Sequence, residues 1–482
     1  MATAGVAKGA APNKLDFIRH TFGVPLAVLL TAAIWFMHTP VGLSVQGQRA
    51  LALFVGIFVL YLSEAIPLAV SSLLVVPAAV LMGIINVGGA LSGFANPSAY
   101  LILGAFVLAT GMVKTGLAER ITYLILSKTG SSPMRITLGI TIANIVIGFL
   151  GPSTTARTAI LLPICMGIIS LFSSQGRSNF AIAILLISCF TNSTIGAGIL
   201  TATVPNPVTV AFLAKTGRMV TYVDWLIYGF PTALIMTFFT WWFVMKVYKP
   251  EAAGDPAEVD RIIRERLRKM GKTTSAEWRA LSIFLLITFL WATQNFTKLD
   301  TTVVCLLGDV LLFVPKFGVI SWEDANKGVS WQVLLIAGGG ISLGEILMKT
   351  GAAKWLATTI FNTLGLRGAS TLLVLVVIML IVQYMHFFFS TTVAMATALM
   401  PIVLAMAETA HINPLVLALP AGMIIGGGPL LMFYNTLPNV VVYGTGKLRV
   451  EDFPKVGIVL CAVACLLYAL TAATYWRWLG LF

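Results

Sequence analysis

The sequence predicts an all-helical protein that crosses a membrane many times. Of its 482 residues 58% are hydrophobic and only 10% are charged, against about 25% in ordinary soluble domains. Uncharged stretches long enough to cross a bilayer also recur along the chain. A soluble globule could not bury that much apolar surface, and a disordered chain would have the opposite composition. The composition therefore excludes soluble enzymes, secreted disulfide scaffolds and fibrous proteins.

The net charge of +13 reflects membrane orientation. Many of the cations lie in short polar segments between apolar runs, where lysine and arginine set the side of the membrane that a loop occupies. We therefore expect the lipid bilayer, and no nucleic acid, as a partner. No metal and no cofactor is expected, because the cysteines lie in apolar segments without metal-site or disulfide spacing. They are Cys165, Cys189, Cys305, Cys461 and Cys465.

The chain divides into four predicted regions. A polar, cytoplasmic N-terminal tail covers 1–21, and a first apolar half covers 22–248. The segment 249–279 is rich in lysine and arginine, which places this linker in the cytoplasm. The second half covers 280–482 and ends with a span at about 455–475. Further spans are predicted at about 22–37, 49–66, 68–85, 136–156, 225–246, 280–297 and 300–315.

Three short motifs of the first half recur in the second half, in the same order. They are Lys114-Thr115-Gly116 with Lys349-Thr350-Gly351, Ser153-Thr154-Thr155 with Ser390-Thr391-Thr392, and Thr203-Val204-Pro205-Asn206 with Thr436-Leu437-Pro438-Asn439. The two copies lie about 235 residues apart each time. One such match would be weak, but three at nearly constant spacing indicate an internal duplication.

The two Ser-Thr-Thr motifs are predicted to interrupt apolar helices near the middle of the bilayer. A helix that starts at such a joint presents free N–H groups and the positive end of its dipole, and the hydroxyls add uncharged donors. Two joints that face each other would fit an anion with two carboxylates. The candidate residues are Ser153, Thr154, Thr155, Ser390, Thr391 and Thr392.

The two Thr-x-Pro-Asn motifs predict a second pair of broken helices. Proline at 205 and 438 prevents a continuous helix, and Asn206 and Asn439 are able to bond to the freed backbone groups. A single motif of either kind would more often be helix packing. The duplication favours a binding site instead, because paired interruptions are hard to explain as packing. This site also includes Thr203, Pro205, Asn206, Thr436, Pro438 and Asn439.

These motifs resemble those of the divalent anion:sodium symporters, which carry dicarboxylates, tricarboxylates or sulfate. The family's Glu-Ala-Ile-Pro stands here at 64–67, its Ser-Asn-Thr signatures correspond to 153–155 and 390–392, and its Thr-Pro-Pro-Asn segments to 203–206 and 436–439. The resemblance covers nearly the whole chain. It implies an inverted-repeat fold with about eleven spans and two re-entrant hairpins, which we place at about 92–113 and 328–348. It also implies a homodimer, elevator-type alternating access, and substrate contacts from the Ser-x-Thr tips.

Two departures from the family's pattern bear on ion coupling. Both signature asparagines are threonine here, Thr154 and Thr391, so the amide oxygens that the family places beside sodium are missing. Four residues before each signature serine, where sodium-coupled members carry an oxygen-bearing side chain, the sequence has Phe149 and His386. Phenylalanine offers no ligand for a hard cation. A protonated His386 would instead be a fixed positive charge.

Arg157 follows the first Ser-Thr-Thr motif in an otherwise uncharged run, and Ala394 takes its place in the second half. Intramembrane cations are costly and usually mark a transport pathway, although such an arginine can also snorkel or pair with an acid. With an arginine at this position, the sequence resembles family members that exchange carboxylates without sodium. We expect fixed charges on Arg157 and His386 to favour obligate exchange, because an empty, positively charged site would reorient poorly.

The sequence thus predicts a secondary transporter of small dicarboxylates, of the succinate, malate, fumarate and 2-oxoglutarate class, in the inner cell membrane. Sodium-independent antiport is the leading interpretation. The alternative is a sodium- or proton-coupled symporter of di- or tricarboxylates or sulfate. An enzyme is not expected, since there is no H-E-x-x-H metal motif, and the lack of a Walker A loop argues against an ATP-driven pump.

Overall fold

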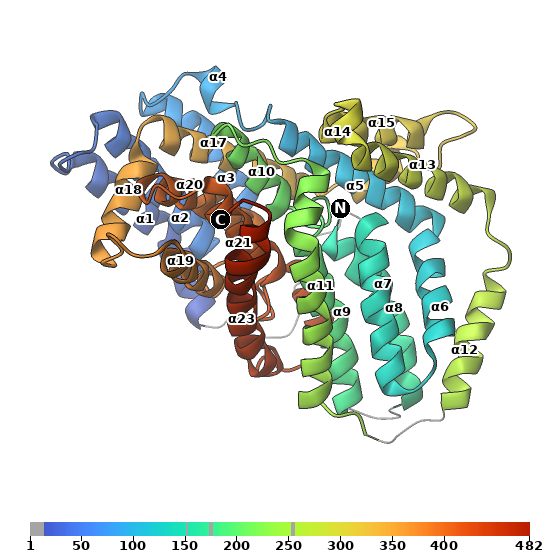
Figure 1. The fold of residues 1–482 in the computed structure, drawn as a ribbon. Coiled ribbons are helices and arrows are strands. Elements are labelled where there is room, and N and C mark those ends of the chain that lie inside the picture. The colour runs from blue at the N-terminus through green and yellow to red at the C-terminus, as the bar shows by residue number, and fades with distance from the viewer. Residues whose placement is uncertain (1–13, 151–152, 173–176, 252–255) are drawn as a thin grey trace.

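The computed structural model describes residues 14–150, 153–172, 177–251 and 256–482, and this part of the chain contains helices and loops but no strand (Figure 1). Four helices come first: α1 (Lys14–Phe36), α2 (Val45–Ser63), α3 (Leu68–Leu81) and the short α4 (Val87–Ala90). The predicted tail 1–21 is only partly within the described residues, because 1–13 lie outside them. Its remainder forms the first turns of α1, which begins at Lys14 and becomes apolar from His20.

Two series of seven helices follow one another in matching order. The first is α5 (Pro97–Thr115), α6 (Leu117–Thr129), α7 (Pro133–Leu150), α8 (Thr154–Phe172), α9 (Asn179–Ala197), α10 (Pro205–Lys215) and α11 (Tyr222–Val247). The second is α17 (Trp331–Lys349), α18 (Ala352–Thr363), α19 (Thr371–Met385), α20 (Thr392–Thr409), α21 (Pro414–Gly427), α22 (Leu437–Tyr443) and α23 (Asp452–Thr471), extended by a π-helical turn, η1 (Ala472–Trp476). Each duplicated motif stands at the same helix boundary in both series. The inverted orientation of the two copies stays a prediction.

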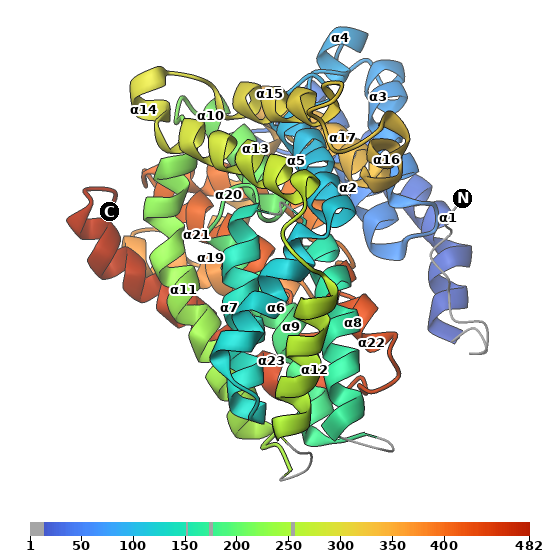
Figure 2. The same cartoon turned by 90° about the vertical axis from the view of Figure 1, so that its right-hand side faces the viewer.

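Five helices connect the two series: α12 (Pro256–Lys269), α13 (Ser275–Ala292), α14 (Gln294–Thr297), α15 (Thr301–Phe313) and α16 (Trp322–Gly328). The surface helix α12 lies along α6 and α8, with acid in its first turn and basic residues in its last (Figure 2). The predicted linker 249–279 ends too late, because Thr274 and Glu277 form a capping box that starts α13 at Ser275. Residues 252–255 of that linker lie outside the described residues.

Ten of the described helices are long and apolar enough to cross a membrane, and five shorter apolar helices accompany them. This agrees with the expectation of about eleven spans. The most enclosed is α9, which is buried along its whole length and contacts its counterpart α21. Around this pair the two series interlock: α10 packs on α20, and α22 packs on α8. The break between α9 and α10 therefore lies near α20, which begins at the second Ser-Thr-Thr motif. The break between α21 and α22 lies near α8, which begins at the first.

The hairpins predicted at about 92–113 and 328–348 are wrong. The structure has the continuous helices α5 and α17 there. Their glycines permit close helix packing: a Cβ on Gly104 would lie 2.6 Å from Oδ2 of Asp309, and a Cβ on Gly340 would meet the side chain of Thr397. In membrane proteins small residues often serve that purpose. The helix pairs that turn back at the Ser-Thr-Thr motifs are α7–α8 and α19–α20 instead (Figure 1).

Candidate substrate site

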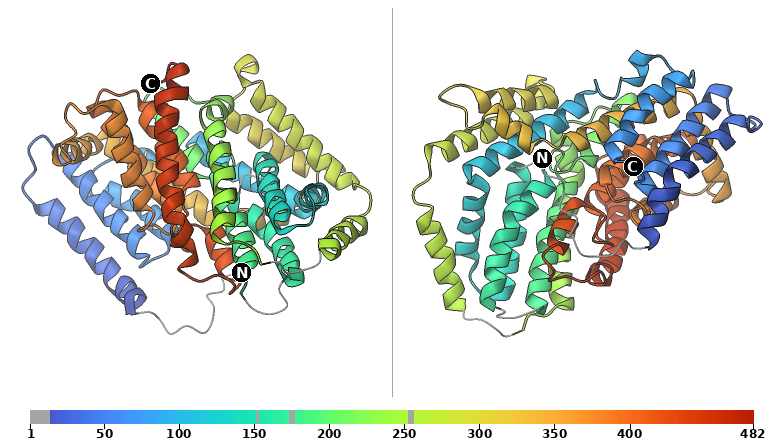
Figure 3. Two further views of the ribbon diagram at one scale, coloured as in Figure 1. Left: turned by 60° about the horizontal axis from the view of Figure 1, so that its bottom comes forward. Right: turned by 180° about the vertical axis from the view of Figure 1, so that it is seen from behind.

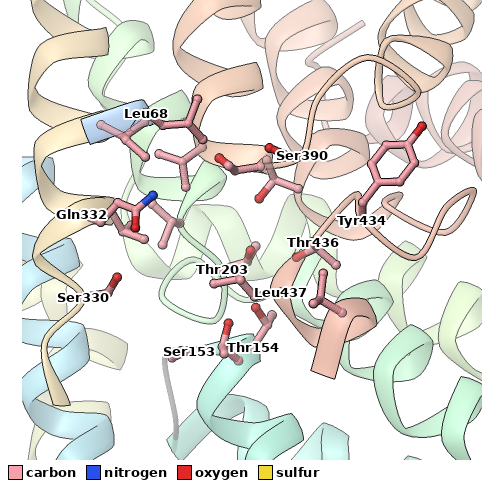
Figure 4. Close-up of a pocket in the computed structure, with 18 of the residues that line it drawn as sticks. Leu68, Ser153, Thr154, Thr203, Ser330, Gln332, Ser390, Tyr434, Thr436 and Leu437 are labelled. Atoms are coloured by element: carbon pink, nitrogen blue, oxygen red, sulfur yellow. The ribbon is translucent and has the colours of Figure 1, made fainter. Parts of the chain in front are cut away.

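The two Ser-Thr-Thr motifs meet at one cavity of about 900 Å³. In Figure 4, Ser153 and Thr154 stand at the N-terminal end of α8, Ser390 approaches from the second series, and Thr203 and Thr436 lie between them. The predicted site residues that line this cavity are Ser153, Thr154, Thr155, Thr203, Ser390, Thr391, Thr392 and Thr436. Eight hydroxyl groups from both series thus converge on a single space.

Both helices that begin at these motifs are capped by one of their own hydroxyls. The Ala156 backbone N–H donates to Ser153 Oγ at 3.2 Å, and the Ala394 N–H donates to Thr391 Oγ1 at 3.2 Å. The remaining N–H groups and the positive dipole ends of α8 and α20 are directed toward the cavity, where an anion is favoured. Pro152, which precedes the first motif, lies outside the described residues.

The four remaining Pro and Asn candidates lie behind the cavity wall. Asn206 and Asn439 are completely buried and do not line the cavity, nor do Pro205 and Pro438. The amide of Asn206 donates to the carbonyls of Gly196 and Ile199, both at 2.9 Å. The amide of Asn439 donates to the carbonyls of Pro429 and Met432 at 2.7 and 3.1 Å. The two asparagine amides therefore satisfy carbonyls that each broken helix frees, and none of the four side chains faces the cavity.

Arg157 is buried, with 1% of its surface exposed, and does not line the cavity. Its Nη2 donates to the carbonyl oxygen of Asn192 in α9 at 3.4 Å and to that of Ala202, in the break between α9 and α10, at 3.2 Å. Among the described residues its Nε and Nη1 have no hydrogen-bond partner. The guanidinium thus lies within the break of the first series.

His386, the counterpart of Phe149, lies beside the break of the second series. Its ring is 1% exposed, with Nδ1 at 3.0 Å from the carbonyl oxygen of Gln383 and Nε2 at 3.2 Å from that of Ile425, at the end of α21. A neutral imidazole has only one N–H, so only the protonated ring donates to both carbonyls. His386 does not line the cavity, and Phe149 packs on Phe230 with ring centroids 5.3 Å apart.

Several cavity residues were missed by sequence reasoning. Ser330 and Gln332, at the start of α17, form the wall that faces the Ser-Thr-Thr motifs (Figure 4). Glu64 lines the same cavity from the end of α2, where it has the left-handed conformation with φ of 51°. The Glu-Ala-Ile-Pro segment was the available signal for Glu64. No signal marked Gln332, because its neighbourhood was interpreted as a hairpin.

Four other polar side chains in apolar helices lie away from this cavity. Glu345 and Lys349 form the helix pair that their spacing allows, with Nζ and Oε2 3.3 Å apart, and Lys215 approaches Glu345 more closely at 2.7 Å. Ser342 stands in a G-x-S-x-G sequence, which is typical of a nucleophile elbow. Here it lies inside continuous α17, not at a strand-to-helix turn, and its Oγ accepts from the Gly93 N–H at 3.0 Å.

Known proteins similar to this chain are membrane proteins, and several of them are named as transporters. A "Membrane protein" of Cupriavidus necator is 31% identical over 95% of this chain and 93% of its own. The sodium-dependent dicarboxylate transporters SdcS of Staphylococcus saprophyticus and Staphylococcus aureus are each 29% identical, over 92% and 90% of this chain and 89% and 86% of their own.

Two solved structures share the fold at 12% identity. The YdaH transporter of Alcanivorax borkumensis has a TM-score of 0.56 and covers 98% of this chain and 99% of its own. MtrF of Neisseria gonorrhoeae has a TM-score of 0.57, with 97% and 95% covered. The family described as "Sodium:sulfate symporter transmembrane region" matches residues 20–482. The chain therefore belongs to the sodium:sulfate symporter family, the divalent anion:sodium symporters, as a multi-pass integral membrane transporter.

Proposed function

We propose that this transporter carries small dicarboxylates, held between the two Ser-Thr-Thr motifs. The observation that carries the proposal is the convergence of both motifs, and of the N-termini of α8 and α20, on one cavity. A dicarboxylate has two negative groups, and each helix terminus offers one favourable position for such a group. The names of the two staphylococcal relatives support the same substrate class.

For coupling, we propose sodium-independent exchange. A sodium ion at either break would need oxygen ligands, and backbone carbonyls are suitable ones. At the first break Arg157 already donates to the carbonyls of Asn192 and Ala202. At the second, the ring of His386 lies within hydrogen-bond distance of the Ile425 carbonyl. With fixed donors in both breaks, the loaded site is neutralised by the substrate, while the empty site keeps its charge and reorients poorly.

Sodium-coupled symport is the second candidate function, and the comparisons favour it. Both staphylococcal relatives are named as sodium-dependent, and the family description is that of a sodium:sulfate symporter. Elevator-type movement and a homodimer, which the family resemblance implies, belong to either candidate and are part of the proposal.

One experiment separates the two candidates. The purified protein is reconstituted into liposomes that are empty or loaded with unlabelled succinate, and uptake of labelled succinate is followed with sodium or choline outside. Exchange predicts rapid uptake into loaded liposomes in choline and little uptake into empty ones. Uptake into empty liposomes that requires a sodium gradient would contradict exchange and support symport.

The substrate assignment has its own control in the same liposomes. Unlabelled malate and fumarate should compete with labelled succinate, whereas sulfate at the same concentration should not. Uptake of labelled sulfate without uptake of labelled succinate would reject dicarboxylates as the substrate class whichever coupling is found.

A further inference from the structure

A second hollow lies on the outer side of α1, α2 and α3, away from the substrate cavity. It is an open groove of about 570 Å³ whose lining is almost entirely apolar. Figure 3 shows α1, in dark blue, along the edge of the molecule. The rim of the groove includes Val28 and Leu81, which are 63% and 86% exposed. In a membrane protein such a surface faces lipid.

The length of the groove matches one leaflet of a bilayer. Along α1 it runs from Val24 to Phe36, which is about 18 Å at 1.5 Å per residue. Half of a hydrocarbon core of about 30 Å is about 15 Å. At the floor of the groove α1 and α2 pack closely, because a Cβ on Gly56 would meet the hydroxyl of Thr31. The groove is therefore about as long as the acyl chains of one leaflet.

One end of the groove carries a cation. The guanidinium of Arg49 lies 4.9 Å from the ring centroid of Trp35, and its Nη1 donates to the Met82 carbonyl at 3.2 Å. Trp35 and Met82 both line the groove. Arg49 is only partly exposed, and no ion pair joins it to an acid of the described residues. Tryptophan and arginine at the end of an apolar span are typical of the headgroup level of a membrane.

We propose that this groove binds one anionic phospholipid, with an acyl chain between α1 and α3 and the phosphate at Arg49. Apolar burial alone would accept any phospholipid. The half-buried arginine without an acidic partner selects an anionic headgroup, because basic groups beside membrane helices bind such lipids. The bound lipid would anchor α1 to the rest of the protein.

The test compares two neighbouring positions of α1. Ala32 lines the groove, whereas Ala33 is exposed and does not line it. Delipidated protein in detergent is titrated with phosphatidylglycerol or phosphatidylethanolamine of equal chain length, and bound lipid is counted by native mass spectrometry. We expect one retained lipid, with phosphatidylglycerol favoured about five-fold. Ala32→Trp should weaken the binding of both lipids at least about ten-fold, and Ala33→Trp should leave the binding of both unchanged.

The headgroup is tested separately. Arg49→Gln should remove the preference for phosphatidylglycerol but keep binding of both lipids, and Arg49→Lys should restore part of the preference. Equal lipid binding by the Ala32→Trp and Ala33→Trp variants would overturn the proposal. So would a lower dimer fraction in Ala32→Trp without a change in bound lipid, because the groove would then hold a second copy of the chain.

Discussion

The break in each helix series leaves backbone carbonyls without their helical donors, and the side chains that donate to these carbonyls differ between the two breaks. In each, a buried asparagine amide satisfies two carbonyls that the broken helix frees, Asn206 in the first and Asn439 in the second. The additional donor differs: the first break holds the permanent cation of Arg157, and the second holds His386, whose charge depends on protonation. The asparagines have a structural role in both breaks. We infer that the difference between Arg157 and His386 sets the ion coupling of transport.

Removing the permanent cation should have the largest effect. Arg157→Met keeps the length of the side chain but loses the charge, so we expect exchange to fall by roughly 100-fold, equivalent to about 3 kcal/mol. Counterflow of labelled succinate measures it. The matched control is Arg264→Met on exposed α12, which should transport normally. A normal rate in Arg157→Met would remove the functional difference between the breaks.

The two Ser-Thr-Thr motifs should contribute equally. Thr155→Ala and Thr392→Ala each delete one cavity hydroxyl, and we expect each to weaken succinate binding by about 1–3 kcal/mol, the cost of a lost hydrogen bond to a charged group. Isothermal titration calorimetry in detergent gives the dissociation constants. Thr359→Ala is the control, because Thr359 is exposed on α18 and its hydroxyl donates to the Trp355 carbonyl of the same helix. Parental affinity in both cavity variants would refute the proposed site.

The two asparagines should matter for stability more than for affinity. Asn206→Ala and Asn439→Ala each leave two buried carbonyls without their donor, so the free energy of unfolding should fall by about 1–2 kcal/mol in both. The melting temperature in detergent measures this, with Asn362→Ala on the surface as the reference. A much larger loss at one asparagine would show that the breaks differ structurally as well.

The titratable donor should give the smallest effect. His386→Gln retains a donor but not the charge, and we expect a decrease in exchange of only a few-fold. Lower pH favours the protonated ring, so parental exchange should rise from pH 7.5 to 5.5, and this rise should disappear in the variant. His38→Gln, an exposed change, should keep the parental pH profile. An unchanged profile in His386→Gln would assign the pH dependence to the substrate.

The duplication allowed most of the hydroxyl-bearing residues of the cavity to be predicted from sequence, because equal spacing of hydroxyl motifs implies equivalent places in two similar halves. The hairpins could not be placed, since the sequence does not distinguish a glycine that turns the chain from one that packs against a neighbour, as Gly104 does against Asp309. Arg157 and Thr154 are three residues apart on one helix, yet the longer side chain passes the cavity and ends in the break beside Ala202. That destination depends on where α9 and α10 separate, which no local pattern encodes.

The size of the cavity has a consequence for selectivity. A volume of about 900 Å³ corresponds to roughly thirty water molecules at about 30 Å³ each. A four-carbon dicarboxylate displaces only some of that water, so the bound anion retains part of its hydration shell. Partial hydration lowers the desolvation cost of a doubly charged solute, and it also leaves room for additional methylene groups. The transporter should therefore discriminate weakly by chain length and strongly by the number of carboxylates.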